Sequence, residues 1–258
     1  MNNDPWKIYS NELSELLSLE THPVAINCLE KKEVQPDAKK VRICRSILEA
    51  ASGKAREIYK ENNACFGANW HLGFQKNENP KVRQITKKFV VEGEKLFSSY
   101  EALENLIAEM EKPPDNADNC FTLVPMDQTE REPELVIFVC NPEQACRLLT
   151  FVTFFEGKMP SIKIGGPTCR MAVIYPLVSK QMNISFQDYA ARQICKMDKN
   201  QLLVSMPYKM IPKIVENIDK CLAGTAKKEY PEELKVLMQR RRKLSNRKME
   251  RRSSRNEK

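Results

Sequence analysis

The chain has 258 residues, of which 41% are hydrophobic and 29% charged, enough apolar material for one large globular domain or two small ones. Residues 240–258 carry ten Lys or Arg and two Asp or Glu, so they account for the whole formal charge of +8 and the preceding residues are neutral overall. This distribution excludes a generally basic, polyanion-binding body. It predicts a globular body over residues 1–222, followed by a linker and a basic C-terminal helix over residues 223–258.

The sequence shows no export or membrane signal. Its first residues lack a basic stretch followed by an apolar run. The longest apolar stretches, such as residues 148–155, are far shorter than the roughly 18–20 residues that cross a bilayer. We therefore expect a cytoplasmic protein without a membrane span. In that reducing compartment, nine cysteines without short regular spacing are expected to be buried thiols, metal ligands or reactive groups rather than disulfides.

Hydrophobic spacing predicts helices and strands that alternate along the chain. The expected helices cover about residues 6–17, 43–60, 100–110, 142–155 and 208–222, with one more after Cys169 and a terminal helix from about 230. The expected strands cover residues 24–29, 134–140, 161–164 and 202–206. Ser98 and Ser99 are candidate caps for the helix at 100–110.

The clearest local unit lies in the middle of the chain. A continuous apolar run at 134–140 is typical of a buried strand, and Asn141-Pro142-Glu143-Gln144 is typical of a helix start, because Asn caps free amides and Pro fits the first turn. Gly157 is the expected stop, and residues 161–164 are the expected returning strand. This strand-helix-strand unit predicts an α/β body, with mixed α+β as the variant.

The segment from Ala64 to Phe74 combines a thiol, a histidine, a tryptophan and two glycines, a mixture that neither an amphipathic helix nor a regular strand requires. Cys65 and His71 are therefore the candidate catalytic pair, as nucleophile and base. Their six-residue separation does not fix their geometry, and a histidine beside a loop is more often a structural hydrogen-bonding group.

Two other thiols stand at expected helix starts. Gly165, Gly166 and Thr168 precede Cys169, an arrangement that favours a thiolate or a bound anion at free backbone amides, although such glycines also make ordinary turns. Cys44 has Arg42 and Arg45 beside it, yet a single free cysteine is more often a small buried hydrophobe. Cys140 and Cys146 are expected to be buried in that way, while Cys28, Cys195 and Cys221 carry no specific signal.

Short motifs in a fixed order give the chain a resemblance to a known family. They are His22-Pro23-Val24-Ala25-Ile26, Cys44 with Ala50-Ala51-Ser52-Gly53, Cys65-Phe66-Gly67-Ala68 with Leu72-Gly73, Asn141-Pro142-Glu143-Gln144-Ala145, Cys169, and Asn183-Ile184-Ser185 with Arg192 and Met206-Pro207. Over about residues 5–220 the chain resembles a widespread archaeal and bacterial family known only as a domain of unknown function.

The resemblance implies a shared cysteine site but no reaction. The family pattern carries cysteines at the positions of Cys44, Cys65 and Cys169, and Asp188 stands here where a fourth cysteine is expected. Three thiolates and a carboxylate can hold an iron-sulfur cluster or a zinc ion. Asp188 and Arg192 are expected at the same pocket.

These observations support three functional hypotheses. The first is a cytoplasmic metal-binding or iron-sulfur protein, related to redox chemistry, in which the three thiols converge. The second is a thiol-dependent enzyme or a small-molecule or anion-binding protein that uses Cys169, Cys65 and His71. The third is weak contact with a polyanion such as nucleic acid through the basic tail. The absence of P-loop, zincin, zinc-ribbon and serine-hydrolase motifs lowers support for those classes, and the expected partner is a small molecule or a redox protein.

Overall fold

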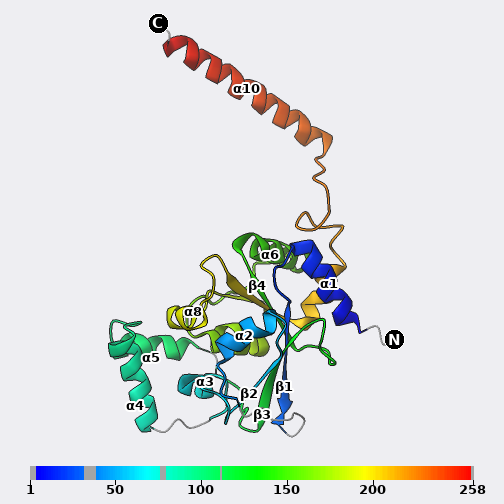
Figure 1. Ribbon diagram of the computed structural model, residues 1–258. Coiled ribbons are helices and arrows are strands. Elements are labelled where there is room, and N and C mark those ends of the chain that lie inside the picture. Colours follow the sequence, from blue (N-terminus) through cyan, green and yellow to red (C-terminus); the bar gives the residue numbers. More distant parts are fainter. Residues whose placement is uncertain (1–3, 32–38, 76–79, 111, 257–258) are drawn as a thin grey trace.

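The computed structural model describes residues 4–31, 39–75, 80–110 and 112–256 (Figure 1). Within these residues, six strands form one antiparallel sheet in the order β2-β3-β1-β4-β6-β5. The strands are β1 (Val24–Glu30), β2 (Arg56–Tyr59), β3 (Asn119–Pro125), β4 (Leu135–Cys140), β5 (Asn183–Ser185) and β6 (Leu202–Pro207). The chain is thus a single α/β domain followed by a C-terminal helix.

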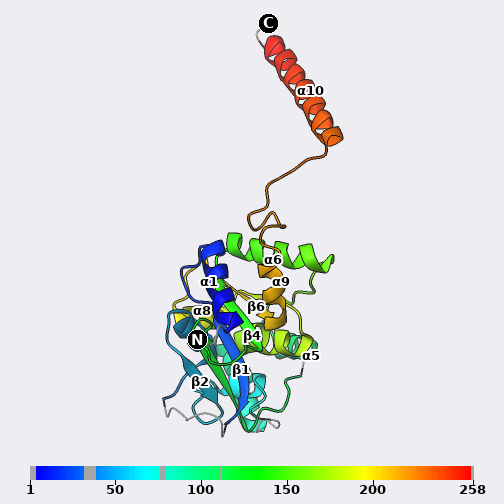
Figure 2. The ribbon, with the colours of Figure 1, turned by 90° about the vertical axis from the view of Figure 1, so that its right-hand side faces the viewer.

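Helices cover both faces of this sheet (Figures 1 and 2). Alternate residues of β4 contribute to two separate cores: Leu135 and Ile137 to one, Val136 and Phe138 to the other. We call the first side the α2 face; it is covered by α2 (Ile43–Ala51), α3 (Phe66–His71) and the π-helix η3 (Cys169–Ile174). We call the second side the α6 face; it is covered by α1 (Pro5–Leu17), α6 (Pro142–Glu156) and α9 (Ile211–Val215).

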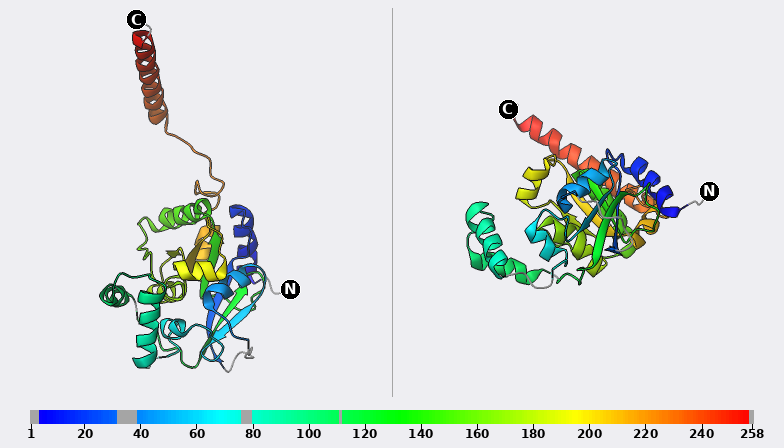
Figure 3. Two further views of the ribbon diagram at one scale, coloured as in Figure 1. Left: turned by 60° about the vertical axis from the view of Figure 1, so that its left-hand side comes forward. Right: turned by 60° about the horizontal axis from the view of Figure 1, so that its bottom comes forward.

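The remaining elements lie at the edges of these layers. They are α4 (Pro80–Lys88), η2 (Phe89–Gly93), α5 (Tyr100–Glu109), α7 (Tyr175–Ser179), α8 (Tyr189–Cys195), η4 (Tyr208–Met210) and α10 (Glu232–Asn256). Helices α4 and α5 protrude side by side from one flank of the body (Figure 3). At the N-terminus of α5, the Ser99 hydroxyl accepts the Ala102 amide at 3.1 Å, which confirms the predicted cap.

The predicted start and end of α6 are confirmed. The Asn141 side chain accepts the Gln144 amide at 2.9 Å, and the Gln144 side chain accepts the Asn141 amide at 2.9 Å, which together make a capping box. Gly157 ends the helix with a φ of 66°, a left-handed conformation that glycine adopts without steric cost.

The strand expected at residues 161–164 is wrong. This segment joins no strand ladder, and the Asn183 side chain bonds both the amide and the carbonyl of Lys163 at 2.9 and 3.1 Å. After α6 the chain returns to the sheet only at β5, which pairs antiparallel with β6. The continuous apolar run of β4 therefore reflects burial on both faces of an antiparallel sheet, not a parallel strand-helix-strand unit.

The helix expected over residues 43–60 is also wrong in its second half. Helix α2 ends at Ala51, Gly53 turns the chain with a φ of 97°, and β2 begins at Arg56. Ile58, which helical spacing assigned to the helix, instead lies in this strand, which pairs with β3. Strand β3 itself has no counterpart among the expected elements.

The terminal helix expected from about residue 230 is confirmed as α10. It projects away from the body (Figures 1 and 2), and its side chains over residues 232–243 are exposed. No helix among the described residues combines the length and the apolar character needed to cross a membrane.

Candidate functional site

Cys44, Cys65 and Cys169 all lie in elements of the α2 face. Cys44 lies in the first turn of α2, Cys65 immediately precedes α3, and Cys169 is the first residue of η3. Burial raises the pKa of Cys169 well above its usual value, and the nearby Cys65, Asp188 and Cys44 raise it further. Residues separated by more than a hundred positions in the chain therefore belong to one electrostatically coupled cluster, which we call the thiol cluster.

Cys195 is a member of this cluster that the sequence did not single out. It is the last residue of α8, which packs against α2. The neighbouring Cys195 and burial raise the pKa of Cys44, whereas the neighbouring Cys44 lowers the pKa of Cys195. A cysteine at the C-terminal end of a short helix has no local signature, so only the packing of α8 against α2 reveals it.

Asp188 holds the surrounding backbone in place. Its Oδ1 accepts the Ala191 amide at 2.8 Å, and thereby caps α8. Its Oδ2 accepts the backbone amide and the hydroxyl of Thr168, each at 3.2 Å. Because both carboxylate oxygens are used in this way, the predicted role of Asp188 as a metal ligand would cost these bonds.

Arg192 is bonded to backbone carbonyls. Its guanidinium donates to the carbonyl oxygens of Phe186, Asp198 and Gln201 at 2.7 to 2.9 Å. It also lines a surface groove with Phe186, Tyr189, Gln193, Lys196, Met197 and Lys199, none of which belongs to the thiol cluster. The guanidinium of Arg192 therefore ties the loop after α8 to the end of β5, and its place in a shared pocket with the thiols stays a prediction.

The turn before Cys169 has the positive φ values that its two glycines allow. Gly165 and Gly166 have φ values of 106° and 78°. The amide of Thr168, expected to bind an external anion, is already taken by the carboxylate of Asp188. The anion at this helix start is thus a side chain of the protein itself.

His71 is placed poorly for general-base catalysis. Its Nδ1 atom is buried without a hydrogen-bond partner. Burial, together with the neighbouring Arg170, lowers its pKa to about 3. An imidazole with that pKa is a weak base at neutral pH. The ring packs edge-on against Trp70, whose face is covered by the fully buried Arg170.

Positive charge and backbone amides surround the thiol cluster. The amides of Ala68 and Gly67 donate to the sulfur of Cys65, and Arg42 also lowers its pKa, although burial raises that pKa overall. Arg170 acts in the same direction on Cys169. Each of these interactions stabilises negative charge on sulfur.

The other thiols differ from this cluster. Burial raises the pKa of Cys140 to about 12, as expected for a structural cysteine in an apolar core. Cys146 is exposed on α6, so the expectation that it faces inward is wrong. Cys221 is buried on the α6 face, away from the thiol cluster.

The side chains that could bind a metal fit a metal site only in part. In the described portion of the chain, no three His, Cys, Asp or Glu side chains are arranged to hold a metal ion. The thiol cluster nevertheless supplies four sulfurs, and several buried thiolates can coexist only when a cation replaces their protons.

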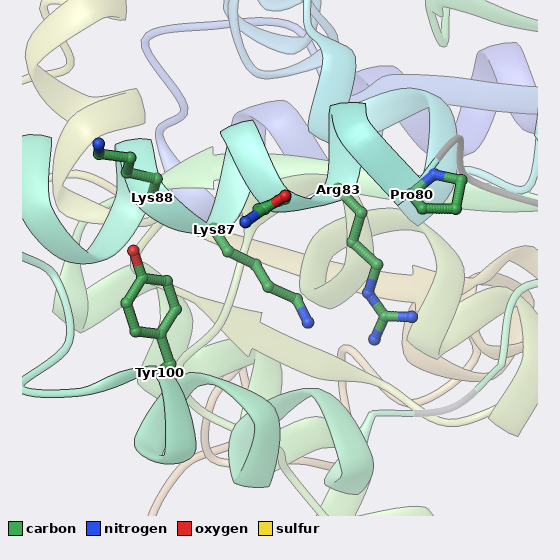
Figure 4. Close-up of a pocket in the computed structure, with 6 residues that line it drawn as sticks. Pro80, Arg83, Lys87, Lys88 and Tyr100 are labelled. Atoms are coloured by element: carbon green, nitrogen blue, oxygen red, sulfur yellow. The ribbon is translucent and has the colours of Figure 1, made fainter.

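A separate pocket of about 650 Å³ lies between α4 and α5 (Figure 4). Arg83, Lys87 and Lys88 line it together with Tyr100. Glu104 pairs with both Arg83 and Lys87, while Glu92 accepts the Tyr100 hydroxyl at 2.6 Å and lies 3.8 Å from the Lys88 ammonium. Two carboxylates of the protein therefore pair with the three cations of this pocket.

Comparisons with known proteins find a relative and a family that match most of the chain. The chain is 22% identical to "Uncharacterized protein MJ0308" of Methanocaldococcus jannaschii over 219 residues, which cover 81% of this chain and 92% of that protein. No solved structure matches the chain. The model of one family matches residues 12–217, a range that includes every member of the thiol cluster. The chain therefore belongs to the DUF169 family, described as "Uncharacterised ArCR, COG2043".

Proposed function

We propose that this protein binds an iron-sulfur cluster through Cys44, Cys65 and Cys169, with Cys195 as the fourth ligand. The observation that carries the proposal is the electrostatic coupling of these thiols in one buried cluster. Cysteine thiolates are the usual ligands of such clusters. Cys195 replaces Asp188 in this role, because the carboxylate of Asp188 is already bonded to Thr168 and Ala191.

The arrangement of possible ligands does not fit a single zinc ion. A tetrahedral zinc site needs its ligands within one coordination sphere, about 2.3 Å from the ion for sulfur. No described group of three ligands is arranged in that way. The thiols are nevertheless close enough to shift one another's pKa, as expected for sulfurs that contact different atoms of a larger group.

The charges around the sulfurs support the same assignment. Hydrogen bonds to the ligating sulfurs and nearby positive charge stabilise the negative charge of a thiolate-bound cluster and tune its potential. Amides donate to Cys65, and Arg42 and Arg170 lie near Cys65 and Cys169. This environment fits an electron-transfer or redox-sensing role, with a redox protein or a small molecule as partner.

The test is anaerobic reconstitution of the full chain with ferrous iron and sulfide. We expect a brown protein with thiolate-to-iron charge-transfer absorption and with bound iron and sulfide. Serine substitution of Cys44, Cys65 or Cys169 should remove most of both, whereas Cys221→Ser, in the opposite core, should leave them unchanged. Equal iron content in all of these variants, or binding of zinc alone, would overturn the assignment.

A second, accessory function is contact with a polyanion through α10. The helix carries nearly all of the net charge of the chain and stands clear of the body (Figure 1). Binding through lysine and arginine alone is non-specific and strongly weakened by salt. It would bring the folded body to nucleic acid or to another acidic surface without reading its sequence.

A further inference from the structure

We infer that the surface groove along α8 binds nucleotides, either free or within a single strand of nucleic acid. In this groove, which we call the α8 groove, a base stacks on exposed aromatic rings and the adjacent phosphate contacts lysines. The α8 groove has a volume of about 460 Å³, within the roughly 300–1,000 Å³ typical of small-ligand sites. None of the described residues that line it belongs to the thiol cluster, so the inference does not depend on the proposed iron-sulfur cluster.

Two exposed aromatic residues line the α8 groove. Phe186 follows β5 and is 50% exposed, and Tyr189 begins α8 and is 67% exposed. Every nucleic-acid base has a π-face that stacks on such a ring, whatever the identity of the base. The two rings therefore offer a stacking surface at the point where the sheet passes into the helix.

Unpaired positive charge lies beside these rings. Lys196 and Lys199 line the α8 groove and are exposed. No carboxylate is among the described lining residues, and neither lysine takes part in an ion pair of the described chain. The cations between α4 and α5, in contrast, pair with Glu92 and Glu104. Ammonium groups beside aromatic rings are the combination that binds the phosphate and the base of a nucleotide.

Arg192 holds the α8 groove in shape. Tyr189, Arg192 and Lys196 follow one another at intervals of three and four residues along α8 and its C-cap, so they lie on one face. The guanidinium donates to the carbonyl of Phe186 and to two carbonyls of the loop that carries Lys199. These bonds join the segments that supply a ring and a cation. The site is thus formed before its ligand arrives, which lowers the entropic cost of binding.

The basic tail cannot supply the same recognition. Residues 232–256 include no aromatic residue, so α10 has no ring on which a base could stack. Its contact with a polyanion depends on phosphates alone. Any part of the affinity that depends on bases must therefore come from the body, and the contribution of α10 is the same in every variant of the α8 groove.

The test compares two probes of equal charge with the full-length protein. One is a fluorescein-labelled oligodeoxyadenylate, and the other is an abasic oligomer of the same length, which has the phosphates without the bases. Fluorescence anisotropy at one salt concentration should show tighter binding of the oligodeoxyadenylate. Displacement of this probe by adenosine monophosphate would identify a free nucleotide as the ligand, whereas displacement only by unlabelled oligodeoxyadenylate would identify a single strand. Both results support the inference.

Removal of either ring should abolish the preference for bases. Phe186→Ala and Tyr189→Ala should each weaken binding of the oligodeoxyadenylate by roughly 5-fold to 150-fold and leave binding of the abasic oligomer unchanged. Tyr189→Phe, which keeps the ring, should bind as the unsubstituted protein does. Phe154→Ala is the matched control, because Phe154 is 49% exposed on α6. Since all of these rings are exposed, the urea midpoints of the variants should agree.

The lysines should act on both probes. Lys196→Gln and Lys199→Gln should each weaken the binding of both oligomers and make it less dependent on salt. Equal affinity of the unsubstituted protein for the two probes, or unchanged binding after loss of both rings, would overturn the inference. Binding of labelled polyglutamate that Phe186→Ala abolishes would also overturn it, because the α8 groove would then fit an acidic peptide.

Discussion

The two faces of the sheet use their buried residues differently. On the α6 face, the core is apolar, its two buried thiols Cys140 and Cys221 are not among the thiol cluster, and the polar groups at the start of α6 bond one another in a capping box. On the α2 face, the core includes Cys169 with the half-buried Cys65 packed against it, and the fully buried Arg170 and a carboxylate that joins two helix starts lie beside it. Buried polar groups cost free energy unless they are paired. A core that holds them is therefore a candidate for a functional site, and we assign the proposed function to the α2 face.

The sharpest test of this comparison is Asp188→Ala on the α2 face. The substitution removes a helix cap and two charge-assisted hydrogen bonds to Thr168, so we expect the free energy of unfolding to fall by about 2–4 kcal/mol. Urea denaturation measures this loss. Asp188→Asn keeps an acceptor for the cap and should lose only about 1 kcal/mol. Equal stability of the two variants would show that the carboxylate charge does not hold these helix starts together.

The matching test on the α6 face is Asn141→Ala. Loss of the capping box should lower the free energy of unfolding by about 0.5–2 kcal/mol, without any effect on iron content. Asn200→Ala, at an exposed position, is the control and should remain within about 0.5 kcal/mol of the unsubstituted protein. A change in iron content on replacement of Asn141 would mean that the two faces are coupled.

The half-buried His71, whose Nδ1 atom is fully buried, predicts an acid-sensitive α2 face. Its pKa is lowered from 6.5 to about 3, so between these values the unfolded chain binds a proton that the folded chain does not. The contribution of His71 to stability is therefore complete above pH 6.5 and declines as the pH falls towards 3. Urea denaturation at a series of pH values should show a shallower decline for His71→Gln than for the unsubstituted protein. His22→Gln, which alters the other histidine, should retain the steeper decline.

The smallest expected effect concerns the tail. Ending the chain at Gln239 should leave the free energy of unfolding within about 0.5 kcal/mol, because residues 232–243 of α10 are exposed. The same truncation should abolish the steep salt dependence of binding to a homopolymeric RNA. A truncated protein that does not fold would contradict the separation of body and tail.

Local sequence patterns predicted many individual elements. Some features depend only on neighbouring residues and could be predicted without tertiary information. They are the helix cap at Asn141, the helix end at Gly157 and the strand at 134–140. The end of α2 was not predicted, because the apolar residues before and after Gly53 share a helical spacing. The structure instead places Ile58, after Gly53, in a strand. Strand β3 was not predicted, because it is defined by pairing with β1 and β2, which are distant from it in the chain.

The candidate site divides in the same way. The sequence by itself predicted that Cys44 and Cys169 stand at helix starts and that Cys65 lies in an unusual glycine-containing segment, and it determined that the net charge lies in the tail. Only the tertiary structure decided that Cys195 joins them, that Asp188 is engaged as a cap, and that Arg192 bonds carbonyls elsewhere. Those three outcomes depend on how α8 packs against α2 and η3. Contacts between elements distant in the chain are set by burial of the whole core, which no local pattern encodes.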